Sequence, residues 1–242
     1  MPPEIVRDGV LLVDTFVAPG RALPAAAGRC RPAVALLAAT AAALLFTAIA
    51  LPRVDFERRA AATLERRPDG TELTAHEREE ALKRAAKIGA VGAWASAALG
   101  PTLLALGAAA ALWVGFRVAG ARPGFRPTFA VVAQGMLPAR LAPLLAIPAV
   151  VASAPVPAED LHRLLPSSLA ALLTPSAPPA LAAALGGVDL FALWSAALVA
   201  SGMARAAGTS RRRAVAVTAV LYVAAIALLH VVPSALPGAT PP

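Results

Sequence analysis

Residues 188–213 read VDLFALWSAALVASGMARAAGTSRRR, and this stretch decides the fold. It opens with an acid, Asp189, continues through an apolar run, and closes on three consecutive arginines at 211–213. A helix of about 20 apolar residues crosses about 30 Å of hydrocarbon. Lys and Arg just beyond such a helix mark its cytoplasmic end. The stretch therefore predicts a transmembrane helix whose C-terminal end faces the cytoplasm.

The composition of the whole chain also favours a membrane protein. Apolar residues make up 58% of the 242 residues, and several apolar runs are long and continuous. Continuous runs predict helices rather than the alternating strands of a barrel, because a helix satisfies its own backbone groups in lipid. The formal net charge is +8, and the basic residues lie mainly beside the apolar runs, where they meet anionic headgroups. We therefore expect the lipid bilayer as a partner, and not nucleic acid.

The apolar runs predict an all-α, polytopic membrane helix bundle with about five transmembrane helices and one polar helical hairpin. Residues 1–32 are predicted to form a juxtamembrane segment, 33–51 the first span, and 52–87 the hairpin. Residues 88–242 complete the membrane bundle, with spans at about 88–116, 128–152, 188–204 and 214–232. The proline-rich segment 167–185 favours interfacial or re-entrant pieces over a sixth crossing.

The hairpin carries the clearest local signals. Residues 53–67 are compatible with a helix, and Pro68-Asp69-Gly70 is typical of a turn. Thr74 and Glu77 fit a capping box, with Thr74 as the N-cap of a second helix. Ion pairs four residues apart are expected along that helix, between Glu79 and Lys83 and between Glu80 and Arg84.

The second span contains a row of small residues, Gly92, Ser96 and Gly100. Such a row allows a neighbouring helix to approach closely, so we expect it to be a packing surface. Pro101 follows Gly100 directly, and the pair is predicted to kink or restart the helix.

The third span is interrupted by prolines, including Pro138, and contains the polar residues Gln134 and Arg140. An arginine near a helix centre costs about 2.5–3.5 kcal/mol on insertion scales. Arg140 is therefore either a functional residue, or a side chain that reaches an interface or pairs with an acid such as Asp189. In the fourth span, the hydroxyls of Ser195 and Ser201 are expected to bond back to their own helix.

The distribution of Lys and Arg predicts the orientation. Outside the spans there are four before the first span, nine in the hairpin, then three, one and four in the following loops. With five spans, the N-terminus, the 117–127 turn and the 205–213 loop share the cytoplasmic side, and the C-terminus lies outside. The nine basic residues of the hairpin conflict with this arrangement, so the side of the hairpin stays open.

Three motifs carry a family resemblance. They are Phe16-Val-Ala-Pro19-Gly-Arg-Ala22 near the start, Gly124-Phe125-Arg126-Pro-Thr-Phe129 before the third span, and Asp189-Leu-Phe191-Ala-Leu-Trp194 with Gly202 in the fourth. Together with the Gly100-Pro101 pair and the hairpin, they make the chain resemble the bacterial branch of the Yip-one family. That family of integral membrane proteins is named for yeast members that bind Ypt/Rab GTPases. The resemblance implies a multi-pass protein of the bacterial cytoplasmic membrane.

The resemblance also implies a non-enzymatic adaptor, scaffold or membrane-organising protein, with membrane or peripheral proteins or a second copy of the chain as partners. The alternative is a small-solute transporter or channel that uses Gln134 and Arg140 in a proline-broken span. The chain has no HExxH or Gly-x-Ser-x-Gly motif, and we expect no enzyme, no cofactor and no metal site. The candidate functional or packing residues are Asp189, Phe191, Trp194, Gly202, Gly100, Pro101, Pro138 and Arg140.

Overall fold

The computed structural model describes residues 4–56, 61, 74–153, 156–157, 166–174 and 177–232. Most of these residues are helical, which confirms the predicted all-α membrane bundle. The longer helices are α1 (Glu4–Val17), α2 (Pro19–Arg29), α3 (Ala33–Ala50), α5 (Ala75–Val118), α6 (Phe125–Gly135), α10 (Leu190–Ala206) and α11 (Arg211–Ile226). The shorter pieces are α7 (Leu137–Leu141), α8 (Ile147–Ala152), α9 (Pro179–Gly186), three 3₁₀ turns, η1 (Leu51–Arg53), η2 (Ala142–Ala146) and η4 (Leu169–Leu172), and the π-helical turn η5 (Ala227–Val231).

Three helical segments of the described chain are long and apolar enough to cross a membrane: Ala33–Arg53, Ala75–Val118 and Arg211–Leu229. The segments Phe125–Gly135 and Leu137–Ala152 are bent by 44° at their break and give a fourth candidate if they form one broken span. Helix α10 is apolar but has 17 residues. A total of about five spans requires α10 to cross as well, and this number stays a prediction.

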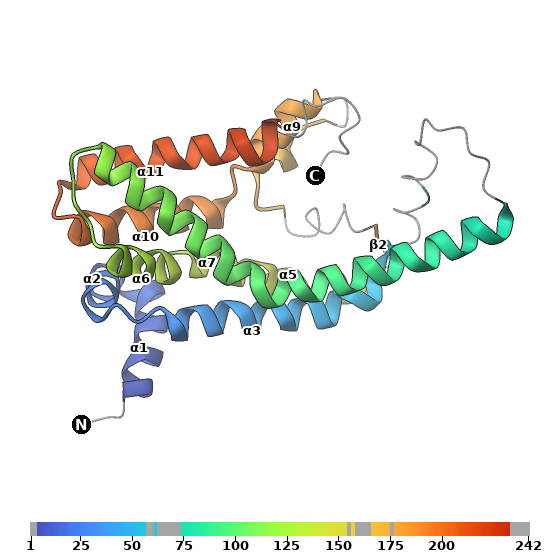
Figure 1. Ribbon diagram of the computed structural model, residues 1–242, viewed down its shortest axis with the longest axis horizontal. Helices are drawn as coiled ribbons and strands as arrows, with labels where there is room; N and C mark the ends of the chain where they lie inside the picture. The colour runs from blue at the N-terminus through green and yellow to red at the C-terminus, as the bar shows by residue number, and fades with distance from the viewer. Residues whose placement is uncertain are drawn as a thin grey trace.

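Helix α5 runs without interruption through 44 residues, which corresponds to about 66 Å of helix. The predicted boundary between hairpin and bundle, at 87–88, falls inside it. A restart at Gly100-Pro101 is wrong, because Pro101 lies within the helix and is buried. Proline removes one backbone hydrogen bond and bends a helix, but packing of the flanking turns can keep the helix continuous. Figure 1 shows α5 changing direction part-way along its length.

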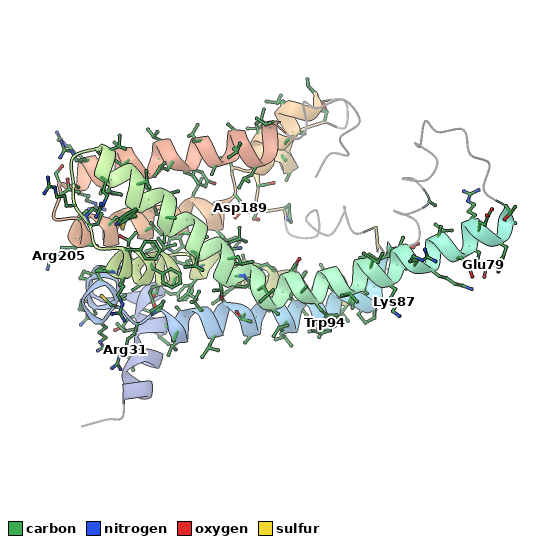
Figure 2. All side chains as sticks on the ribbon, viewed as in Figure 1. Arg31, Glu79, Lys87, Trp94, Asp189 and Arg205 are labelled. Carbon is green, nitrogen blue, oxygen red and sulfur yellow. The ribbon has the colours of Figure 1, made fainter. Side chains whose placement is uncertain are left out.

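The two ends of the bundle differ chemically. Helices α3, α5, α10 and α11 run lengthwise, whereas α1 runs across them (Figure 1). Arg31 and Arg205 lie at one end and Glu79 at the far end (Figure 2). The first end, here called the basic end, contains α2, the loop between α5 and α6, and the loop between α10 and α11. Its arginines are Arg21, Arg29, Arg31, Arg117, Arg122, Arg126, Arg205, Arg211, Arg212 and Arg213. The three segments that the sequence predicts to share the cytoplasmic side therefore lie together.

The main core is formed where α5, α6, α10 and the start of α11 meet. Phe116 and Met203 are fully buried there, with Val131 and Val132 of α6 between them. Helix α3 packs along α5, and its Ala35 and Ala39 are buried in a smaller cluster with Ala133 of α6 and Leu137 of α7. Alanine and valine side chains fill these contacts, which explains how so many short helices approach each other closely.

Within the residues that the structure describes, the small-residue row of the second span is open. Gly92 and Ser96 are exposed, and a Cβ added at Gly92 or Gly100 would meet no atom within 4 Å. Helix α5 instead buries Ala97, Pro101, Ala105 and Ala109. The row is therefore open within the described residues, alanines form the packed face of α5, and the predicted packing surface stays a prediction.

The end of the first span is tied to the end of the third. Strands β1 (Val54–Asp55) and β2 (Val156–Pro157) pair in parallel. The Arg53 guanidinium also donates to the backbone carbonyls of Val151, at 2.9 Å, and Ser153, at 3.1 Å. The predicted helix at 53–67 does not begin at Arg53, because Val54 and Asp55 are extended and pair with β2. Most of its remaining residues lie outside those that the structure describes.

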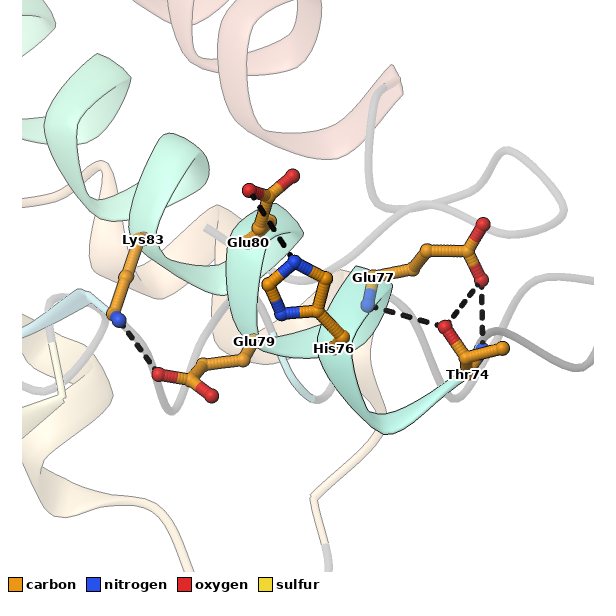
Figure 3. Close-up of polar contacts among 6 residues, drawn as sticks. All are labelled: Thr74, His76, Glu77, Glu79, Glu80 and Lys83. Carbon is orange, nitrogen blue, oxygen red and sulfur yellow. Dashed lines mark hydrogen bonds and ion pairs between the residues drawn. The ribbon is translucent and has the colours of Figure 1, made fainter.

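The predicted capping box at the start of α5 is confirmed (Figure 3). The Glu77 N–H donates to Thr74 Oγ1 at 3.3 Å, and the Thr74 N–H donates to Glu77 Oε2 at 2.9 Å. The ion pair between Glu79 and Lys83 is also confirmed, at 2.6 Å. Glu80 lies 3.8 Å from His76. No ion pair joins Glu80 to Arg84 within the described residues.

Candidate functional site

The candidate residues of the fourth span begin with Asp189, which caps the N-terminus of α10. Its Oδ1 accepts hydrogen bonds from the N–H groups of Phe191, at 2.9 Å, and Ala192, at 3.0 Å. Its Oδ2 accepts a very short hydrogen bond from the Ser167 hydroxyl. A carboxylate in this position satisfies N–H groups that have no partner within the helix. Asp189 therefore fixes both the start of α10 and the loop before it.

The hydrogen bonds of Asp189 with Ser167 and the start of α10 are here called the anchor, and backbone contacts extend it. The Leu169 N–H donates to the Val188 carbonyl at 3.0 Å, and the Leu190 N–H donates to the Ser167 carbonyl at 2.9 Å. From α11, the Tyr222 hydroxyl donates to the Gly187 carbonyl at 2.7 Å. Sequence reasoning missed Ser167 and Tyr222, since they are separated from Asp189 by more than 20 residues and belong to no motif. The anchor joins η4, α10 and α11.

Trp194 joins α10 to the N-terminal segment. Its ring meets that of Phe16 edge to face, with centroids 5.7 Å apart. Phe16 opens the first motif of the family resemblance, and Trp194 belongs to the last one. Aromatic pairs in this geometry contribute about 0.5–1.5 kcal/mol beyond the area they bury. Two motifs separated by most of the chain therefore meet in one contact.

Ser195, the next residue, supports the break in the third span. Its Oγ accepts a hydrogen bond from the Ala139 N–H at 3.1 Å. Pro138 is buried at the start of α7, where the 44° bend interrupts the backbone ladder. In lipid, backbone groups freed by such a break need partners from neighbouring helices. The prediction that the Ser195 hydroxyl bonds to its own helix is therefore wrong, because this hydroxyl bonds to α7.

Gly202 and Gly135 allow α10, α6 and α2 to approach each other. A Cβ at Gly202 would lie 2.5 Å from Val131 Cγ1 and 3.2 Å from Leu23 Cβ. A Cβ at Gly135 would lie 2.7 Å from the Val199 side chain and 3.1 Å from its backbone nitrogen. Gly135 was not among the predicted candidates, although it directly follows Gln134.

Gln134 binds the N-terminal helix. It is 5% exposed, and its Nε2 donates to the Leu11 carbonyl at 2.9 Å and to the Thr15 hydroxyl oxygen at 2.5 Å. Thr15 is completely buried. The amide is thus occupied by an intrachain contact that holds α1 against α6. Thr15 was missed because a threonine in a mixed N-terminal segment gives no signal of burial.

Arg140 lies apart from this cluster of contacts. It is half-buried on α7, and within the described chain its guanidinium has neither a hydrogen bond nor an ion pair. Asp189 is bonded to Ser167 and to the α10 backbone instead. The predicted alternative in which these two residues pair is therefore wrong. Two other candidates, Gly100 and Pro101, lie on α5.

The contacts among α1, α2, α6, α7 and α10 are here called the signature junction. Its members are Phe16, Gln134, Gly135, Ser195, Trp194 and Gly202, together with the partners given above. A family model described as the Yip1 domain matches residues 13–232. The chain belongs to the Yip1 family. No curated protein and no solved structure matches it.

In this Yip1 protein, the chemistry of the signature junction is that of packing and hydrogen bonding. Asp189, the one acid after residue 160, is used as a helix cap. The described residues contain no group of three His, Cys, Asp or Glu side chains placed to hold a metal ion. The arrangement joins the N-terminal helices to the broken third span and to α10.

Proposed function

We propose that the protein acts as a non-enzymatic adaptor, scaffold or membrane-organising protein. The observation that carries this proposal is the polar arm, residues 74–87, which forms the N-terminal part of α5. The arm projects away from the bundle (Figures 1 and 2). At 1.5 Å per residue its helical part is about 20 Å long. A rigid, water-exposed arm on a membrane bundle is suited to binding another protein.

The side chains of the arm support this role. Those of Glu79 and Lys83 are 64% and 68% exposed, and those of His76 and Glu80 are 83% and 62% exposed. Hydrogen bonds from Thr74 hold the pKa of the Glu77 carboxyl below its usual value, and the Lys83 ammonium does the same for the pKa of Glu79. The arm therefore presents stable charges of both signs at neutral pH. Such a surface favours a polar protein partner rather than lipid tails.

Helix α1 supports a membrane-organising role. Val10, Val13 and Val17 are 53%, 62% and 77% exposed and share one face of the helix. The opposite face is held to the bundle through Thr15 and Phe16. Because α1 runs across the lengthwise helices, it would lie in the plane of the membrane surface with this valine face in the lipid.

The basic end suggests the orientation. We place it in the cytoplasm of a bacterial cell, at the inner surface of the cytoplasmic membrane. The N-terminus then lies in the cytoplasm, and the polar arm and the C-terminus lie outside. A partner of the arm would accordingly be an extracytoplasmic or membrane protein, and self-association of the chain is a further expectation.

Site-specific photo-crosslinking in native membranes tests the proposal. A photoreactive residue at Glu80, on the arm, is expected to capture a discrete partner. The same residue at Val220, which is 68% exposed on α11, serves as the control and is expected to capture lipid. Failure of the Glu80 probe to yield any protein adduct, together with recovery of the chain alone from gentle detergent, would overturn the adaptor proposal.

Arg140 favours a second candidate, a small-solute transporter or channel. A half-buried guanidinium without a partner among the described residues, in a broken span, resembles the sites of transporters with discontinuous helices. Gln134 no longer contributes to this candidate, since its amide binds α1. Flux of small solutes into liposomes with wild type and Arg140→Ala decides it. Equal flux would remove Arg140 from consideration.

A further inference from the structure

We propose that a pocket at the basic end binds the phosphate of an anionic phospholipid headgroup. The pocket lies between the end of α5 and the start of α6 and has a volume of about 470 Å³. It is lined by Arg117, Gly120, Ala121 and Arg122. A partly open pocket lined by two arginines is suited to a phosphate, whose oxygens accept charge-assisted hydrogen bonds from guanidinium groups.

The Arg117 side chain is held in place before any ligand binds. Its guanidinium carbon lies 4.1 Å from the centroid of the Trp113 ring. Trp113 in turn meets Phe125 edge to face at 6.2 Å, and Phe125 stacks on Phe129 at 6.2 Å. Stacking uses one face of the guanidinium and leaves the N–H groups at its edge free to donate. The aromatic cluster therefore preorganises Arg117.

The turn after α5 brings the second arginine to the same pocket. The Ala121 N–H donates to the Phe116 carbonyl at 2.9 Å, and the Gly120 N–H donates to the Arg117 carbonyl at 3.0 Å. Gly120 has φ of +83°, a left-handed conformation that glycine adopts without strain. The chain reverses there, so Arg117 and Arg122 line one pocket although four residues lie between them.

The charge of this pocket is not balanced within the described chain. Neither Arg117 nor Arg122 forms an ion pair with the described residues, and both are exposed. The segments 18–32, 117–128 and 205–213 contain no Asp or Glu. Arg211, Arg212 and Arg213 add further positive charge at the same end of the bundle. Both guanidinium groups are therefore without an acidic partner among the described residues and are open to an anion from the surroundings.

The position of the pocket favours a lipid over a soluble anion. It lies at the end of a membrane-crossing helix whose last residue, Val118, is 85% exposed. Trp113 and Phe125 stand beside it, and aromatic rings of this kind collect at the depth of lipid headgroups. A phospholipid can place its phosphate between the two arginines and its acyl chains against the exposed apolar residues.

Binding of phosphatidylglycerol and phosphatidylcholine to the purified full-length chain, followed by native mass spectrometry, tests the proposal. The variant Arg117→Gln/Arg122→Gln is compared with Arg211→Gln/Arg212→Gln, which removes the same charge from the same end but outside the pocket lining. The pocket variant is expected to weaken phosphatidylglycerol binding about tenfold, and the control less than about twofold. Phosphatidylcholine is expected to bind wild type more weakly.

Two further measurements keep the test decisive. Arg122→Gln alone leaves the stack of Arg117 on Trp113 intact. This single variant should also weaken lipid binding, and it replaces the double variant in the test if the double variant does not fold. Inorganic phosphate is added as a competitor to distinguish a lipid site from a site for the free anion. Equal losses in both double variants would show diffuse attraction to the basic end and overturn the pocket. Displacement of the lipid by equimolar inorganic phosphate would overturn the lipid assignment.

Discussion

The Ser195 hydroxyl on α10 accepts a hydrogen bond from the Ala139 N–H on α7, 3.1 Å away, directly after Pro138 breaks the third span. A side chain of one helix thus replaces a backbone acceptor that the broken helix lacks. Ser195→Ala should destabilise the protein by about 1–3 kcal/mol, because it leaves a partly buried N–H without a partner. Thermal unfolding in detergent measures the change.

Ser201→Ala is the matched control for this prediction. Ser201 lies on the same helix and is half-buried, and within the described chain its hydroxyl forms no hydrogen bond with another helix. Its loss should change stability by less than about 0.5 kcal/mol. Similar effects of the two substitutions would show that the bond to Ala139 has no special role.

The close approach of helices at Gly202 predicts that alanine substitutions at Gly202 and Gly92 have different effects on stability. A methyl group at Gly202 would lie 2.5 Å from Val131 on α6, so Gly202→Ala should destabilise the fold by about 1–3 kcal/mol. Gly92→Ala should be neutral or stabilise by up to about 1 kcal/mol, since the position is exposed, open and within a helix. Unfolding of the two variants under identical conditions tests the contrast. If Gly92→Ala is the more damaging, the row around it packs against something outside the chain.

Some features of this fold are predictable from the sequence, and others are not. The length of the apolar runs and the positions of the charges predict the spans, because the lipid bilayer imposes both. The capping box at Thr74 is predictable because its two residues are only three positions apart. The junction of Gln134 with Thr15 joins residues 119 apart, and no local pattern encodes it. The small residues near Gly92 do not reveal which face of α5 packs in the described chain, since alanines form that buried face. Motifs near Phe16 and Trp194 marked important positions without indicating that they touch.

Asp189 and Arg140 should act independently. Asp189→Ala should cost about 0.5–2 kcal/mol through loss of the α10 cap, while Asp189→Asn keeps an acceptor oxygen and should cost less. A double-mutant cycle with Arg140→Ala should give a coupling within about 0.5 kcal/mol of zero, as for separate sites. A larger coupling in thermal unfolding would restore the ion pair that the geometry excludes.

The capping box predicts a loss of order in the polar arm at low pH. Hydrogen bonds from Thr74 lower the pKa of Glu77 in the folded protein. The contribution of Glu77 to the stability of the arm is therefore present above the ordinary value of 4.5 and is lost as the pH falls through the lower folded pKa. The pKa of Glu79 is lowered too, and its effect has the same sign. A nitroxide at Ala75→Cys, in a Cys30→Ser background, should become more mobile as the pH is lowered from 7 to 3.

Thr74→Ala separates the cap from the ion pair. This variant should already be mobile at pH 7 at the Ala75 label and should respond less to acid than wild type. An equal response to acid with and without Thr74 would assign the effect to Glu79 and Lys83 instead.

The lone cysteine offers a test of the proposed orientation. Cys30 follows α2 at the basic end and is half-buried, whereas the polar arm lies at the opposite end. A small membrane-impermeant thiol reagent should therefore modify Cys30 in inverted vesicles and not in intact cells. In a Cys30→Ser background, Glu79→Cys should show the reverse pattern, since α5 begins where the first span has already crossed. Labelling of both positions from the same side would mean that the first span does not cross the membrane. The nine basic residues of the hairpin would then lie in the cytoplasm, where the positive-inside rule alone would put them.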